Sequence, residues 1–146
     1  MGNGRVKKNR IERQIVWGDL DALGIVFYPR YYEWIDACGH LFFDTIGLNL
    51  GDLWHQRSLQ FGLVKTACRY LKPGRYYDHI RITTFIEGLA RKTVDLKHVI
   101  ENRDTGEIMV EGSEKRICLE VSDPLNFRAT NIPEDVYAVF KEAKGD

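Results

Sequence analysis

The sequence predicts an α+β fold in which one curved antiparallel sheet wraps around one long, buried helix. Residues 29–46 carry a broad apolar stripe at helical spacing, which is too apolar for a surface helix. Four consecutive segments of β character follow between residues 59 and 121, and a short alternating segment precedes the helix at residues 10–16. Strands of this length curl, so one sheet around one helix is the simplest arrangement that buries both.

The first strand is expected at residues 10–16, where apolar and polar side chains alternate. The long helix is expected to begin at Pro29, a favourable residue for a first turn, and to stop at Gly47, a natural left-handed terminator. The stripe that it would bury consists of Tyr31, Trp34, Ile35, Cys38, Leu41, Phe42 and Ile46.

Residues 48–58 are expected to form a connection with one helical turn, and the four later strands to span residues 59–71, 78–89, 92–102 and 107–121. In the last strand the apolar phase changes from even to odd positions, which predicts a bulge near Gly112. Residues 133–143 are expected to form a short helix. Residues 1–8 are expected to be a flexible tail and residues 9–146 a single domain.

Composition excludes several classes of function. The 146 residues carry no net charge, so there is no overall electrostatic case for binding nucleic acid or an acidic membrane surface. No apolar run is long enough to span a bilayer, and the start of the chain lacks the apolar segment of a signal peptide. A long sheet leaves an exposed edge that a second copy could pair with, so we expect at least a homodimer.

Cofactor chemistry is not expected from the sequence. The three cysteines, Cys38, Cys68 and Cys118, lie far apart among apolar residues and are interpreted as reduced thiols of a cytoplasmic protein. The four histidines have no metal-ligand spacing, and neither a glycine-rich phosphate loop nor a serine nucleophile elbow is present.

The stretch most suggestive of chemistry is residues 17–29, between the first strand and the helix. It holds Asp19 and Asp21, and it ends where unpaired N–H groups around Tyr28 to Arg30 would open the helix. A carboxylate beside amide donors that can hold a developing oxyanion is suited to acyl transfer. Aspartates that merely cap the turn are the alternative, and spacing does not decide between the two.

The segment Gly18-Asp19-Leu20-Asp21-Ala22-Leu23-Gly24-Ile25-Val26-Phe27-Tyr28-Pro29, followed by Tyr31, Tyr32 and Trp34, resembles the 4-hydroxybenzoyl-CoA thioesterase family of hotdog-fold proteins. In that family a D-x-D-x-x-G-[IV]-V element precedes the central helix. The resemblance extends to Ala90-Arg91-Lys92-Thr93 and Arg128-Ala129. It implies hydrolysis of an acyl-coenzyme A thioester in sites formed between subunits of a dimer or of a tetramer of two dimers.

The resemblance also implies roles for individual residues. Asp21 takes the position of the catalytic carboxylate, as nucleophile or general base, and the Tyr28 N–H that of the donor to the thioester carbonyl. Asp19 looks like a supporting residue, and Gly24 permits a tight backbone turn.

The substrate would contact further positions. Arg91, Lys92, Thr93 and Arg128 match positions that contact the nucleotide and phosphates of coenzyme A. The acyl pocket would draw on Phe27, Tyr32, the strand around residues 64–68 and residues of a partner subunit. Relatives that act on aliphatic acyl-CoAs often carry histidine at the position of Tyr28, so tyrosine there favours an aromatic acyl group. Some relatives carry another basic residue at the position of Ala90, so the strength of nucleotide binding is not determined by the resemblance.

Two alternatives remain at this point. A hotdog hydratase or dehydratase needs a histidine paired with the acid, and none lies in residues 17–29. A non-catalytic acyl-CoA sensor or scaffold is the other, although sensors of this fold carry an added DNA-binding domain for which 146 residues leave no room. Glu33 on the helix is a minor alternative base, and His40 and His55 are expected to be structural or exposed.

Overall fold

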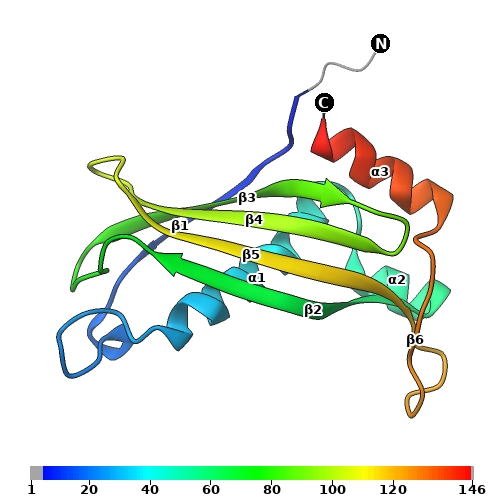
Figure 1. Ribbon diagram of the computed structural model, residues 1–146, viewed down its shortest axis with the longest axis horizontal. Coiled ribbons are helices and arrows are strands. Elements are labelled where there is room, and N and C mark those ends of the chain that lie inside the picture. Colours follow the sequence, from blue (N-terminus) through cyan, green and yellow to red (C-terminus); the bar gives the residue numbers. More distant parts are fainter. Residues whose placement is uncertain (1–4, 146) are drawn as a thin grey trace.

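The structure is a computed structural model that describes residues 5–145. Its sheet is antiparallel throughout and has the strand order β1-β3-β4-β5-β2, with a short β6 paired to β5. The strands are β1 (Asn9–Gln14), β2 (Leu59–Tyr70), β3 (His79–Leu89), β4 (Thr93–Asn102), β5 (Ile108–Glu120) and β6 (Arg128–Ala129). Figure 1 shows the sheet curving around the helix α1 (Pro29–Thr45), so the expected architecture is confirmed.

Helix α1 packs its apolar stripe into the sheet in two clusters. Its first half joins a cluster with β1, β3 and β5, and its second half joins a cluster with α2 (Leu50–Arg57) and α3 (Glu134–Lys144). The expected stripe is buried except for Leu41, which is 43% exposed, and Phe43 is buried in its place. Gly47 has a φ of +86° and ends the helix as expected.

Two short helices differ from the expectation: one is longer than the single turn expected, and the other was not expected. The connection at residues 48–58 contains a full helix, α2, because the Asn49 side chain caps it by accepting a hydrogen bond from the Asp52 N–H at 2.9 Å. A 3-10 helix, η1 (Trp17–Asp19), opens the loop after β1. Of the expected tail, residues 1–4 lie outside the described residues, whereas the Lys7 N–H already donates to Ala143 O at 2.8 Å.

A bulge does occur in β5 close to Gly112, at Met109: Ile100 pairs with Val110 but Glu101 pairs with Ile108. From Val110 to Cys118 the even residues of β5 are buried, but two of these inward positions are occupied by Glu114 and Arg116 rather than by apolar residues. Buried charges at inward positions therefore mimic a change of phase. A further register shift lies in β2 between Leu63 and Lys65, and it changes the residues that β2 turns inward.

Glu114 and Arg116 belong to a buried polar network behind α1. His98 Nε2 lies 2.9 Å from Glu114 Oε1, and Arg116 Nη2 donates to Glu114 Oε2 at 2.8 Å and to Asp36 Oδ1 at 2.9 Å. The helix can approach this network because residue 39 is glycine: a Cβ there would lie 2.6 Å from Glu114 Oε1. The network thus fixes the helix against the middle of the sheet.

Candidate active site

The loop between β1 and α1 is folded into a tight hairpin that presents Asp21. Leu20 and Val26 form an antiparallel bridge, and the Asp21 N–H donates to Ile25 O at 2.8 Å. The turn closes through Gly24, whose φ of +77° is a conformation that a residue with a side chain rarely adopts. The glycine singled out in the sequence therefore shapes the loop, and it does not line the cavity described below.

One oxygen of the Asp21 carboxylate is held and the other is available. Oδ1 accepts a hydrogen bond from the Leu23 N–H at 2.8 Å, which fixes the side chain in an Asx turn. Within residues 5–145, Oδ2 receives no hydrogen bond from another protein group. The side chain is partly exposed and faces a cavity, so its free oxygen can reach a bound substrate.

The start of α1 supplies one free amide rather than a set of them. The Arg30 N–H donates to Phe27 O at 2.9 Å and the Tyr31 N–H donates to Tyr28 O at 3.0 Å, so neither is available, contrary to the expectation for Arg30. Pro29 has no N–H. The Tyr28 N–H has no acceptor among the residues that the structure describes, and it sits at the positive end of the helix.

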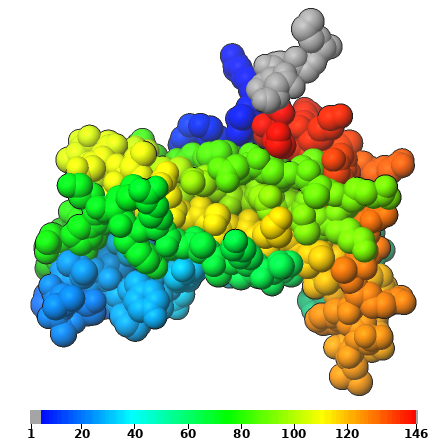
Figure 2. Space-filling model, in the orientation of Figure 1, coloured from blue at the N-terminus to red at the C-terminus, as the bar shows by residue number. Residues whose placement is uncertain are grey.

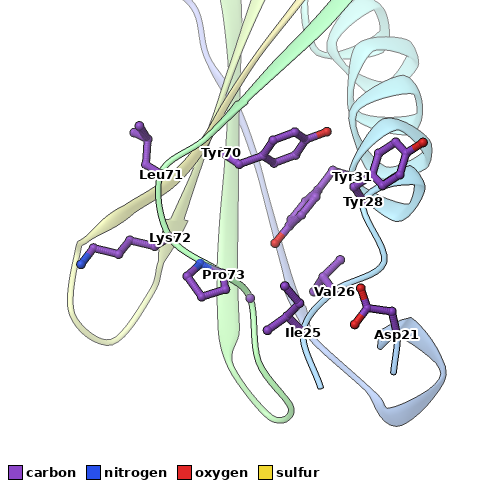
Figure 3. A pocket seen from close by; sticks show the side chains of 10 residues that line it. Asp21, Ile25, Val26, Tyr28, Tyr31, Tyr70, Leu71, Lys72 and Pro73 are labelled. Carbon is purple, nitrogen blue, oxygen red and sulfur yellow. The ribbon is translucent and has the colours of Figure 1, made fainter. Parts of the chain in front are cut away.

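Asp21 and Tyr28 line the same cavity of about 380 Å³ (Figure 3). Most of its wall is apolar or aromatic, and its remaining lining residues are Ile25, Val26, Tyr31, Tyr70, Leu71, Lys72, Pro73 and Gly74. The Lys72 ammonium points away from the cavity in Figure 3 and lies 3.6 Å from Glu107 Oε2. The carboxylate of Asp21 is therefore the one ionised group that the described lining turns toward this space.

Tyr31 and Gly74 join the two loops that frame the cavity. The Gly74 carbonyl accepts the Val26 N–H at 2.9 Å, and the Gly74 backbone also interacts with the Tyr31 hydroxyl oxygen. Burial outweighs this interaction and raises the pKa of Tyr31 to about 12. A Cβ on residue 74 would lie 2.8 Å from Tyr31 Oη, from Val26 Cγ2 and from Ile15 Cδ1. Glycine is thus required for this close approach.

Asp19 lies outside the cavity and holds the base of the loop. It is buried, its Oδ2 accepts the Val16 N–H at 2.9 Å and its carbonyl accepts the Phe27 N–H at 2.8 Å. Arg13 Nη2 and Arg30 Nε each approach its carboxylate at 3.9 Å. Its contacts therefore support the backbone that carries Asp21 and Tyr28.

Phe27 and Tyr32 do not line this cavity. Phe27 is 49% exposed and its ring packs edge-on against Tyr28, with 5.8 Å between centroids. Tyr32 lies one residue along the helix from the wall residue Tyr31, and its hydroxyl lies beside that of Tyr70. Tyr32 thus meets the cavity through Tyr70.

The residues expected to hold coenzyme A lie at the other end of the sheet. Arg91 and Lys92 sit in the β3–β4 turn, Thr93 starts β4, and Arg128 lies on β6, where it pairs with Glu120 at the end of β5. The loop that carries Asp21 lies beside the segment that follows the end of β2, as Figures 1 and 2 show. Twelve residues of strand separate the two ends, which is roughly 40 Å. One chain alone does not bring these groups together.

Sequence reasoning missed most of the cavity wall. Tyr70, Pro73 and Gly74 come from the end of β2 and the turn after it, where the sequence indicates only a strand and a turn. The helical spacing of Tyr31 predicts a residue of the core rather than a residue of the cavity wall. Cys68 and Tyr70 are two residues apart and so share one face of the strand, which is a sequence signal that they act together. No sequence feature, however, marks the register shift in β2 that turns this face inward.

Comparison with known proteins identifies the family. The sequence model of the thioesterase superfamily matches residues 23–109, which is more than half of the chain. The chain belongs to the thioesterase superfamily. It is 28% identical over 133 residues to the 4-hydroxybenzoyl-CoA thioesterase of Pseudomonas sp. strain CBS-3, covering 86% of this chain and 92% of that protein.

Two further similar proteins are also named as thioesterases. The putative acyl-CoA thioesterase YneP of Bacillus subtilis strain 168 is 25% identical over 142 residues, covering 95% of this chain and 98% of that protein. A solved gentisyl-coenzyme A thioesterase is 30% identical, with a TM-score of 0.77, covering 91% of this chain and all (100%) of that chain. The protein is therefore a thioester hydrolase, with the hotdog fold of its superfamily.

No helix within residues 5–145 is both long and apolar enough to cross a membrane.

Proposed function

We propose that the protein hydrolyses an aromatic acyl-CoA at Asp21. The observation that carries the proposal is that a carboxylate oxygen of Asp21 and the Tyr28 N–H, each without a partner among the described residues, belong to one largely apolar cavity. The amide would hold the thioester carbonyl oxygen and stabilise the charge that develops on it. The carboxylate would act on the carbonyl carbon held beside it.

Asp21 can act in either of two ways. As a nucleophile it attacks the thioester carbon, the C–S bond breaks, coenzyme A leaves as its thiol after taking a proton from water, and water then hydrolyses the acyl-aspartyl anhydride. As a general base it takes a proton from a water molecule that attacks the same carbon, the C–S bond breaks, and the proton passes to the departing thiolate of coenzyme A. Both routes consume one water and yield the free acid and coenzyme A.

The walls of the cavity favour an uncharged aromatic acyl group. The rings of Tyr31 and Tyr70 face the cavity with 5.8 Å between their centroids, and Val26 and Pro73 add apolar surface. An acyl group with a second carboxylate would face Asp21 with no free cation in the described lining to offset the repulsion. The relatives named for 4-hydroxybenzoyl-CoA and gentisyl-coenzyme A support this choice.

A second copy of the chain supplies the other half of the site in this proposal. β2 is the last strand of the sheet, and Leu63 and Val64 on it are 48% and 56% exposed. If two β2 strands pair antiparallel along this edge, the start of one lies beside the end of the other. Arg91 and Arg128 of the second copy would then approach the cavity of the first. A tetramer of two such dimers is the assembly that we expect.

The proposed function is tested by release of free thiol from a panel of benzoyl-, hydroxybenzoyl-, phenylacetyl- and straight-chain acyl-CoAs. We expect turnover that is fastest with the aromatic members. Two further assays cover the alternatives: hydration of enoyl-CoA, and calorimetric titration with a non-hydrolysable acyl-CoA. Binding without thiol release, or hydration of the enoyl thioester instead, would contradict the proposal.

The sharing of the site between two copies is tested by mixing inactive chains. Asp21→Asn removes the carboxylate, and the double variant Arg91→Ala/Arg128→Ala removes the cations at the other end. When the two chains are co-expressed with different tags and purified as a mixed dimer, one of the two sites contains every intact residue. We expect this dimer to recover activity that neither parent has. A mixed dimer as inactive as both parents would contradict a shared site.

A further inference from the structure

Tyr70 faces the cavity because of the register shift in β2. Before the shift, the odd residue Phe61 faces the helix and pairs with the buried Cys118. After it, the even residues Cys68 and Tyr70 pair with Gly112 and Val110, which are inward positions of β5. Without the extra residue, the charged Arg69 would occupy this wall. The bulge thus places an aromatic hydroxyl where a cation would otherwise lie.

Tyr70 lies on the wall across the cavity from Asp21, and its ring extends toward the start of α1 (Figure 3). It is 48% exposed, so part of its surface is available to a ligand. Its ring is tilted by 43° against that of Tyr31. The two rings form an apolar surface suited to a flat group.

The Tyr70 hydroxyl is part of a small polar cluster. It lies beside the hydroxyl of Tyr32 and the thiol of Cys68. Burial, together with the neighbouring Tyr32 hydroxyl, raises the pKa of Tyr70 above its usual range, and burial also raises the pKa of the Cys68 thiol. The hydroxyl of Tyr70 and the thiol of Cys68 therefore stay neutral at physiological pH, and each can donate as well as accept a hydrogen bond.

We propose that Tyr70, which lies beside Tyr32 and Cys68, determines the acyl specificity of the enzyme: its ring packs against an aromatic acyl group and its hydroxyl binds a polar substituent on that ring. This inference rests on the proposed function. A neutral hydroxyl can pair with a ring hydroxyl, whereas a substrate that lacks one leaves Tyr70 without that partner. A straight-chain acyl group has neither a flat ring to pack against Tyr70 nor a ring substituent for the Tyr70 hydroxyl.

The test compares kcat/KM for benzoyl-CoA with that for its 2-, 3- and 4-hydroxy isomers. We expect the wild-type protein to prefer at least one isomer over benzoyl-CoA, and Tyr70→Phe to reduce that preference by about five- to tenfold. Tyr32→Phe should reduce the preference in the same direction, because it removes the hydroxyl that lies beside that of Tyr70. Tyr137→Phe, which removes a hydroxyl on α3 at the far end of the sheet, serves as the matched control and should leave it unchanged.

The possible outcomes are distinguishable. If no acyl-CoA in the panel releases thiol, the proposed function itself fails. If hydrolysis occurs but the preference is absent in the wild type, or is the same in Tyr70→Phe and Tyr137→Phe, the proposed function stands and the role of Tyr70 is overturned. Tyr70→Ala adds an independent readout, since loss of the ring should raise KM for every aromatic substrate but not for hexanoyl-CoA.

Discussion

Replacing Asp21 by asparagine is the change that separates chemistry from structure most cleanly at this site. The amide oxygen of the new side chain can still accept the Leu23 N–H that holds Asp21 Oδ1 at 2.8 Å, so the hairpin should keep its shape. What is lost is the negative charge and the ability to take a proton or attack carbon. Because Asp21 is partly exposed rather than buried, the substitution should leave the melting temperature within a few degrees.

The expected effect on catalysis follows from the role of the carboxylate. A positioned base contributes about 10²–10⁴-fold to the rate, which corresponds to roughly 3–5 kcal/mol at about 1.4 kcal/mol for each tenfold change. Steady-state thiol release should therefore show kcat reduced by at least about 100-fold, with KM changed by less than about threefold because the cavity is intact. If kcat stays within about tenfold of wild type while the fold is unchanged, Asp21 is not the catalytic group.

Three further predictions concern the framework of the site. Arg116→Met should lower the free energy of unfolding by about 3–5 kcal/mol, measured with urea, because it leaves the buried Glu114 carboxylate without its cation; a loss below about 1 kcal/mol would contradict this. Gly74→Ala should cost about 1–3 kcal/mol and raise KM, since its Cβ would lie 2.8 Å from three side-chain atoms. Cys38 and Cys118, with pKa values raised to about 11 by burial, should escape iodoacetamide at pH 8 in the native protein and react after unfolding, as judged by mass spectrometry; rapid native labelling would refute this.

The architecture could be predicted because its signals are local. The aromatic stripe of α1 and the terminator Gly47 each determine their element without reference to distant residues. The loop of residues 17–29 could also be singled out, since its two aspartates and Gly24 are close in sequence. These features need no knowledge of how strands are paired.

The remaining features depend on pairing and on burial, which a single sequence does not display. The inward positions of Glu114 and Arg116 could not be predicted because charges are rarely buried unless they find partners, and their partners His98 and Asp36 come from other elements. The inward position of Tyr70 depends on a bulge opposite β5. The β3–β4 turn and the loop of residues 17–29 lie at opposite ends of β2. Residues that could contact one ligand therefore come from opposite ends of the fold.

The most direct test is a crystal structure of the Asp21→Asn protein with an aromatic acyl-CoA bound. The thioester oxygen should lie about 2.7–3.1 Å from the Tyr28 nitrogen, as for other oxyanion donors, and the thioester carbon about 3–3.5 Å from the side chain at position 21. The acyl ring should occupy the cavity beside Tyr31 and Tyr70. An acyl group bound elsewhere, or a thioester carbonyl turned away from the Tyr28 amide, would contradict the assignment of Asp21 as the catalytic residue.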